Sequence, residues 1–178
     1  MIMDNEFWQV KSMEDFTNQE WEQICLRCGK CCAVKTMDAS KVYFYNRLCG
    51  GFDLESGLCK RYDTRLCDDC LKVDMEVLAK HPELLPETCA YRVLKEKGKL
   101  PEYHPLITGD AESVKKANQT VLDWKGVHTI ENLELTVASV LDKANKGNWT
   151  SEQFEDAVHE AVKPFNLVIV EAYQKNGS

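Results

Sequence analysis

The chain has 178 residues, of which 44% are hydrophobic and 29% are charged, and its formal net charge is −7. This length and balance are typical of a globular protein with one domain, or with one domain and an appendage. Because the chain is acidic and shows no basic stripe, we expect it to bind neither nucleic acid nor an anionic membrane.

The amino-terminal segment predicts a cytoplasmic protein without a membrane anchor. Its start, MIMDNEFWQVKSMEDF, lacks the basic region and the apolar run of a signal peptide. No apolar stretch approaches the about 18 residues that a membrane span needs. The following NQEWEQICLRC predicts a short helix from about Asn18, which would deliver Cys25 and Cys28 to the middle of the chain.

The middle of the chain is rich in sulfur. All nine cysteines lie between Cys25 and Cys89. Disulfides are rare in the reducing cytoplasm, and an odd number of thiols cannot pair completely within one chain. A dense set of cysteines in that compartment indicates metal binding first.

The run CLRCGKCC, from Cys25 to Cys32, carries the clearest metal-binding pattern. Its Cys-x-x-Cys-x-x-Cys spacing matches the first three ligands of a bacterial ferredoxin run, and Gly29 would let the backbone approach a cluster closely. The fourth ferredoxin cysteine and its proline are absent, and Cys32 follows Cys31 directly. Since adjacent residues cannot easily aim both sulfurs at one tetrahedral ion, the pair would serve two centres, or one thiol would bind while the other packs or reacts.

Short strands and helices are predicted around the remaining thiols. KVYFYNRLC is strand-like in its aromatic and β-branched content, and FDLESGLCKRY predicts a hairpin that turns at Ser56-Gly57. CLKVDMEVLAKHP predicts a helix that ends before Pro82. TCAYRVLKEKG predicts a second helix, with Thr88 as its N-cap and Gly98 at its end.

A second Cys-x-x-Cys pair, CDDC, occupies residues 67–70. Its two aspartates would repel an anionic cluster, although Arg61 and Arg65 are near enough in sequence to offset them. A four-thiolate zinc site and a four-thiolate cubane in its usual oxidised form both carry a charge of about −2, so nearby cations help either. Charge therefore leaves iron and zinc both open.

The last third of the chain carries no cysteine and is predicted to be helical. TIENLELTVASVLDKANKG places apolar residues, among them Val140 and Leu141, on one face of a helix. TSEQFEDAVHEAV starts with a Thr150-x-x-Gln153 capping box. The change in composition near residue 120 predicts an appended segment.

We therefore predict two parts, a cysteine-cluster metal-binding domain at residues 1–120 and a mainly helical extension at residues 121–178. The expected fold class is α+β. Its core would be small, irregular, cysteine-rich and stapled by metal, with short strands and helices around it.

Several separated motifs occur in an order that resembles a known family. WEQICLRCGKCC is followed by CKRYDTR, CLKVD, LPETCAYRVL and LPEYHPLITGD, with ESV shortly after. Over about residues 18–118 the chain resembles the YcgN-type bacterial cysteine-cluster proteins, which belong to the CxxCxxCC group of zinc- or iron-chelating domains. The function of that family is uncharacterised, and a similar domain in flagellin lysine methylases, its distant relatives, is associated with an iron–sulfur cluster.

The resemblance implies which residues form the site. It marks Tyr62, Arg65, Arg92 and His104 as cofactor contacts, and Cys67 as a departure from the pattern. The implied metal ligands are Cys25, Cys28, Cys31, Cys32, Cys49, Cys59, Cys70 and Cys89.

Eight thiolates are enough for two metal sites with four ligands each. We expect an iron–sulfur cluster of the four-iron type, and a second metal centre is possible with the remaining thiolates. The role would be electron transfer, or support of an enzyme that modifies another macromolecule, with an unidentified protein or redox partner. One alternative is a structural zinc-binding interaction module. Another is a dithiol redox protein that uses Cys67 and Cys70. Whether the chain is itself an enzyme stays open.

Overall fold

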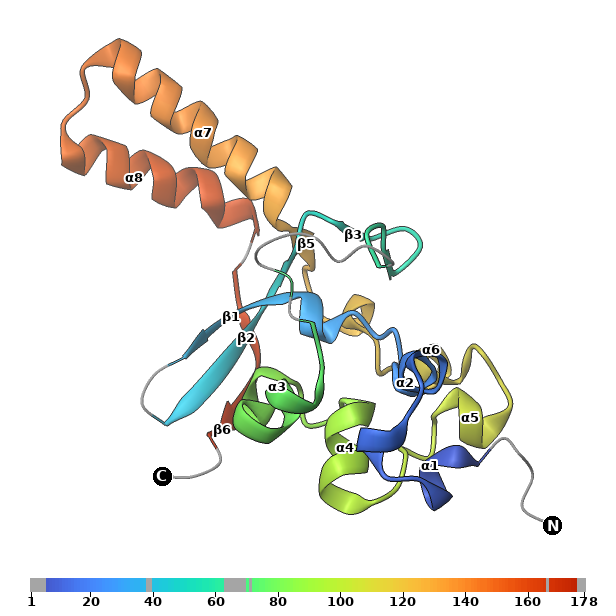
Figure 1. Ribbon diagram of the computed structural model, residues 1–178. Coiled ribbons are helices and arrows are strands. Elements are labelled where there is room, and N and C mark those ends of the chain that lie inside the picture. The colour runs from blue at the N-terminus through green and yellow to red at the C-terminus, as the bar shows by residue number, and fades with distance from the viewer. Residues whose placement is uncertain (1–5, 38–39, 63–69, 71, 166, 176–178) are drawn as a thin grey trace.

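The computed structural model describes residues 6–37, 40–62, 70, 72–165 and 167–175. A group of short helices lies to one side of a small sheet, and a long helical hairpin projects away from both (Figure 1). Helices together with mainly antiparallel strands confirm the predicted α+β class. The metal-stapled core stays a prediction.

The helices before residue 120 are short. They are α1 (Phe7–Val10), α2 (Asn18–Ile24), α3 (Met75–Lys80), α4 (Ala90–Lys97), α5 (Pro105–Thr108) and α6 (Ser113–Lys116). Five single 3-10 turns accompany the helices and strands in the described residues: η1 (Met13–Asp15), η2 (Lys30–Cys32), η3 (Pro82–Leu84), η4 (Val121–Asp123) and η5 (Lys163–Phe165).

Side-chain caps fix where these helices begin. At α2, Thr17 and Glu20 form a capping box, in which the Glu20 amide donates to the Thr17 hydroxyl at 3.2 Å and the Thr17 amide donates to the Glu20 carboxylate at 2.8 Å. Asp74 caps α3 by accepting from the Val77 amide at 2.9 Å. The predicted Thr88 cap of α4 is wrong, because Cys89 takes the N-cap position.

The sheet is organised around β2 (Lys41–Leu48), which forms the predicted KVYFYNRLC strand. On one side β2 pairs antiparallel with β1 (Ala33–Met37). On the other side it pairs antiparallel with β6 (Ile169–Gln174) along its first half and parallel with β5 (His128–Thr129) at its end. The predicted hairpin is present as β3 (Phe52–Asp53) and β4 (Leu58–Cys59).

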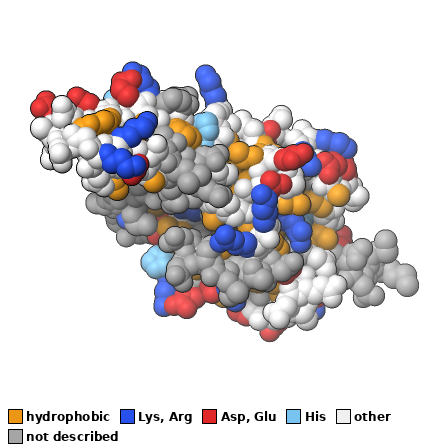
Figure 2. Space-filling model, turned by 90° about the horizontal axis from the view of Figure 1, so that it is seen from above, with side chains coloured by type: hydrophobic (Ala, Val, Ile, Leu, Met, Phe, Trp, Pro, Cys, Tyr) orange, Lys and Arg blue, Asp and Glu red, His pale blue; other side chains and the backbone are white. Residues whose placement is uncertain are grey.

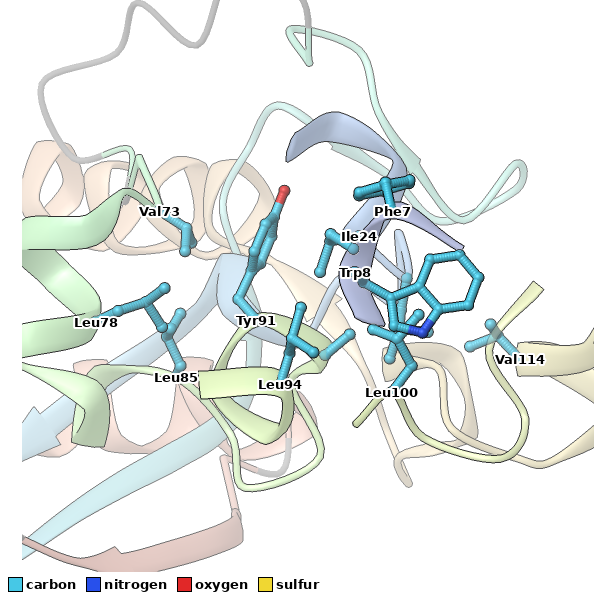
Figure 3. Packing of buried hydrophobic residues seen from close by; sticks show 12 residues of the cluster. Phe7, Trp8, Ile24, Val73, Leu78, Leu85, Tyr91, Leu94, Leu100 and Val114 are labelled. Atoms are coloured by element: carbon cyan, nitrogen blue, oxygen red, sulfur yellow. The ribbon is translucent and has the colours of Figure 1, made fainter. Parts of the chain in front are cut away.

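Two hydrophobic clusters make up the core. The first lies among the helices, where Figure 3 shows Tyr91 and Leu94 of α4 together with Ile24 of α2 and Trp8 of α1. The second lies on the sheet and includes Val42, Phe44 and Leu48 of β2, all fully buried. The segment from Cys25 to Cys32 connects these two clusters.

The carboxy-terminal part contains the two predicted helices, α7 (Ile130–Gly147) and α8 (Ser151–Val162), which pack against each other as the projecting hairpin (Figure 1). Val140 of α7 is buried, whereas Leu141 of the predicted apolar face is 47% exposed. The chain then returns to the body of the molecule as β6. The carboxy-terminal part therefore contributes strands to the sheet as well as helices.

The surface mixes charges of both signs. On the face in Figure 2, lysine and arginine side chains alternate with acidic ones, and small hydrophobic patches lie between them. Within the described residues, no helix has both the length and the apolar character that crossing a membrane requires.

Candidate metal centre

A cavity of about 250 Å³ lies where the cysteine segments meet. Its walls come from the end of α2, the η2 turn, the β3–β4 hairpin and the start of α4. Seven thiols line it: Cys25, Cys28, Cys31, Cys32, Cys59, Cys70 and Cys89.

Cys49 is the eighth described cysteine and lies at the end of β2, next to this wall. Its backbone amide donates to the carbonyl of Cys32 at 3.0 Å. No disulfide joins any two of the eight described cysteines, and each of them is partly buried. The structure thus gathers in one region all the cysteines that the sequence assigned as metal ligands.

The loop from Cys25 to Cys32 winds tightly around the cavity. It leaves α2 at Cys25 and turns through two left-handed residues, Arg27 (φ 51°) and Gly29 (φ 76°), before it enters η2. A Cβ atom on Gly29 would lie 2.5 Å from the Phe52 ring and 2.8 Å from Val121. Only glycine satisfies both the left-handed backbone and this close approach.

Backbone amides point at several of the sulfurs. The Arg27 amide donates to Cys25 Sγ, and the Gly51 amide donates to Cys49 Sγ, each at 3.4 Å. The amide of Lys30 donates to the sulfur of Cys28, and the sulfur of Cys89 accepts from amides in the first turn of α4. In each case the donor set includes the residue two places after the cysteine. Such amides stabilise a sulfur that carries negative charge.

Without a ligand, the buried thiols hold their protons at neutral pH. Burial raises the pKa of Cys28, and burial raises the pKa of Cys89 to about 12. A hydrogen bond with Cys31, together with burial, raises the pKa of Cys32. Binding of a metal would therefore displace protons from these thiols.

Two lysines lie under the cysteine loop. Lys30 is buried, and its Nζ donates to Glu171 of β6 at 3.0 Å and to the Thr88 hydroxyl at 3.4 Å. The Nζ of Lys35 donates to the Cys31 carbonyl at 2.7 Å. Burial lowers the pKa of Lys35. Lys35 is close enough to Cys31 and Cys32 to interact with their charges and could offset an anionic centre there. The charge of Lys30 is already paired with Glu171.

Of the predicted cofactor contacts, Tyr62 lines the cavity. Its hydroxyl donates to the Glu22 carboxylate at 2.6 Å, and the Arg27 guanidinium lies 4.5 Å from the centre of its ring. Burial raises the pKa of Tyr62, so its hydroxyl stays protonated and can donate. Tyr91 also lines the cavity, and it stacks on Trp21.

His104 and Arg92 do not line the cavity, and both make hydrogen bonds to the backbone. His104 is buried, and its Nδ1 accepts from the Leu106 amide at 3.0 Å, so its Nε2 donates to the Ile24 carbonyl at 3.1 Å. Both ring nitrogens are thus used by backbone, and the ring supports the end of α2 just before Cys25. The Arg92 guanidinium donates to the Leu85 carbonyl at 3.0 Å. The predicted contact Arg65 lies outside the described residues, as does Cys67.

In the part of the chain that the structure describes, no three histidine, cysteine, aspartate or glutamate side chains are placed to hold a single metal ion. The thiols surround a space and do not converge on one point. Neither Lys30, inside the cysteine motif, nor Lys35, three residues after it, was predicted from the sequence, and no local signal could have found Glu171.

The fold and this site define an α+β protein with a thiol-lined cavity. Over 133 residues the chain is 42% identical to a UPF0260 protein of Aliivibrio fischeri, which covers 72% of this chain and 90% of that protein. It is 40% identical over 144 residues to one of Vibrio vulnificus, covering 73% of this chain and 98% of the relative. A Haemophilus influenzae member is 41% identical over 136 residues, covering 72% of this chain and 87% of that relative.

The chain therefore belongs to the UPF0260 family, whose function is uncharacterised. No family model matches the chain, and no solved structure matches it.

Proposed function

We propose that this UPF0260 protein is a cytoplasmic metal-binding protein of the CxxCxxCC kind, and that its cofactor is an iron–sulfur cluster of the four-iron type. The observation that carries the proposal is the set of seven cysteine side chains around one cavity of about 250 Å³. Thiols in the reducing cytoplasm stay available as ligands. So many in one cavity exceed what packing needs.

The surroundings of the sulfurs suit an anionic cluster. Amide donors reach Cys25, Cys28, Cys49 and Cys89, and Lys35 supplies positive charge beside Cys31 and Cys32. When bound, a cluster supplies one-electron redox chemistry, and hydrogen bonds to its sulfurs help to set its potential. Tyr62 and Tyr91 would shield the cluster from water, and solvent exposure also helps to set the reduction potential of a cluster.

The spacing of the thiols favours a cluster over zinc. Four sulfurs at about 2.3 Å from one zinc ion lie about 3.8 Å from each other, and such a set would be recognisable as a single-ion site. The ligands of a cubane bind four different irons and stand farther apart. The Cys-x-x-Cys-x-x-Cys spacing from Cys25 to Cys31 is that of the first three ligands of a ferredoxin run, which supports the second arrangement.

The role that follows is electron transfer, or support of an enzyme that modifies another macromolecule, with a protein or redox partner. A structural zinc module is the competing function, since the Cys-x-x-Cys turn and its amide donors also suit zinc. The two functions differ in the metal that is bound.

Purification without oxygen tests the proposal. We expect a brown protein that contains iron and acid-labile sulfide and absorbs in the visible region. A colourless protein with stoichiometric zinc under the same conditions would refute the iron–sulfur assignment and establish the zinc module.

Two cysteine variants add a matched comparison. Cys28→Ser should lose metal, because Cys28 lines the cavity. Cys67→Ser should keep the full complement, because Cys67 lies outside the implied ligand set. Equal loss from both variants would contradict the assigned ligand set.

A further inference from the structure

Five of the described cysteines pack against one or the other of the two hydrophobic clusters. The partly buried residues that pack against the helical cluster include Cys25, Cys28, Cys31 and Cys89. Cys32, although adjacent to Cys31, packs against the sheet cluster. The η2 turn therefore sends two consecutive thiols to different halves of the molecule.

The four cysteines of the helical half are mutual neighbours. The thiol of Cys28 is close enough to those of Cys25, Cys31 and Cys89 for their charges to interact. Cys89 is likewise close to Cys25 and Cys31. These thiols come from the end of α2, the motif loop and the first residue before α4, so three segments converge on one place.

The cysteines of the sheet half form a second group. Cys32 lies close to Cys49 and Cys59. The Cys49 amide donates to the Cys32 carbonyl at 3.0 Å, and Cys59 of β4 pairs with Phe52, which belongs to the sheet cluster. Cys70, which lines the cavity together with Cys32 and Cys59, is the remaining described cysteine and completes a set of four.

We propose that the eight cysteines form two adjoining metal sites, one held by the helical set (Cys25, Cys28, Cys31 and Cys89) and the other by the sheet set (Cys32, Cys49, Cys59 and Cys70). This inference rests on the proposed metal-binding function and adds the ligand grouping to it. The two sites meet at Cys31 and Cys32, whose thiol hydrogen bond in the metal-free protein is lost when both sulfurs bind metal as thiolates. Each set supplies the four thiolates that a cubane or a zinc ion requires.

Metal analysis of full-length variants purified without oxygen tests this grouping. Cys89→Ser and Cys49→Ser should each remove about half of the bound metal, because each opens only one site. The double variant that combines them should lose nearly all of it. A double variant within one set, Cys28→Ser with Cys89→Ser, should lose no more than Cys89→Ser alone.

A second measurement needs no variant and so does not depend on variant folding. The wild-type protein is treated with a chelator while an alkylating reagent labels released thiols, and labelled cysteines are identified by mass spectrometry over time. We expect two phases, one for the helical set and one for the sheet set. A single phase that includes all eight cysteines would overturn the proposal.

The proposed iron–sulfur function and the proposed ligand grouping can fail separately. If the metal is zinc but the variants and the labelling still divide the cysteines in this way, the iron–sulfur function fails and the grouping stands. If iron and sulfide are present but Cys89→Ser and Cys49→Ser both remove all of the metal, the grouping fails and the function stands. Labelling of all eight thiols before any chelator is added would overturn both.

Discussion

Gly29 is the residue that most constrains the cysteine loop. Alanine at this position would adopt a left-handed backbone at a cost of about 1–2 kcal/mol, and its Cβ would meet the Phe52 ring at 2.5 Å. Overpacking of this kind adds about 1–3 kcal/mol. We expect Gly29→Ala to lower the free energy of unfolding by at least about 2 kcal/mol, measured by denaturant unfolding.

Two other glycines allow the cost of a left-handed backbone to be measured separately from the cost of steric overlap. Gly98 has a similar φ of 66°, but a Cβ there would have no neighbour within 4 Å. Gly51 has an ordinary φ, and its added Cβ would make only normal contact with Arg61. Gly98→Ala should therefore show the backbone cost alone, and Gly51→Ala little effect. A Gly29→Ala protein as stable as the Gly98→Ala protein would show that the packing around the loop adjusts freely.

The buried thiols make the stability of the metal-free protein depend on pH. Burial raises the pKa of Cys89 from 9.0 to about 12. Between these values the unfolded chain loses the thiol proton while the folded protein keeps it, so the unfolded state gains stability as pH rises. We expect the reduced apoprotein to lose about 1 kcal/mol of folding stability per pH unit above about pH 9.

Thermal unfolding of the apoprotein at about pH 8 and about pH 10 measures this effect. The metal-loaded protein is the control, because its bound thiolates carry no proton to lose. Equal losses with and without metal would assign the effect to other groups.

At the scale of secondary-structure elements, local sequence patterns were sufficient to predict most helices and the central strand. The helix start at about Asn18, the Pro82 stop after α3 and the Thr150-x-x-Gln153 capping box of α8 are all local signals, and all are present in the structure. The pairing of β6 and β5 with β2 was missed because it joins segments far apart in the chain. The charged contact of Lys30 was missed for the same reason, since its partner Glu171 arrives with β6. Sequence motifs were sufficient to identify the candidate ligand set. How its members are distributed between the two hydrophobic clusters could be seen only in the fold.

The ion pair between Lys30 and Glu171 links β6 to the cysteine loop. The Lys30 side chain is 5% exposed and that of Glu171 18%. Removing one partner of a fully buried pair costs about 3–5 kcal/mol, and the partial exposure of Glu171 reduces this. We expect Glu171→Gln to destabilise the protein by about 2–3 kcal/mol in denaturant unfolding, scaled down from the fully buried case.

Glu160 offers the matched control for this prediction. It pairs with Lys163 at the same 3.0 Å, but both side chains are about two-thirds exposed, at 67% and 65%. Glu160→Gln should change the stability by less than about 0.5 kcal/mol. Similar effects from the two variants would mean that burial of Lys30 does not matter.

The helical hairpin and the last strand can be separated experimentally. The sequence predicts an appended extension at residues 121–178, but within it α7 and α8 project from the body (Figure 1), whereas β6 pairs with β2. We expect replacement of residues 130–162 by a short Gly-Ser linker to leave the metal content intact. Truncation after Lys125 should lower the melting temperature, because it also removes β5, β6 and Glu171. Loss of metal from the linker variant would show that the hairpin contributes to the site.

For the whole molecule, metal removal should loosen one region and spare another. The two hydrophobic clusters remain without metal, but the loops that carry the thiols are short and depend on ligand bonds for much of their stability. We expect chelation to lower the melting temperature and to speed amide hydrogen exchange at residues 25–32 and 49–59. Exchange in α7 should stay unchanged. Uniform exchange before and after verified metal removal would contradict this expectation.

The contact between Lys30 and Glu171 cannot form until nearly the whole chain has been synthesised. The ribosome releases the cysteine loop early, but the strand that carries its counter-charge is nearly the last segment to emerge. At about 5–20 residues per second, the 141 positions that separate Lys30 from Glu171 take about 7–28 s. During that time the thiols are present on a chain whose sheet still lacks an edge strand. If the protein binds metal as proposed, its thiols can meet the metal before β6 pairs with β2 and before Lys30 gains its counter-charge.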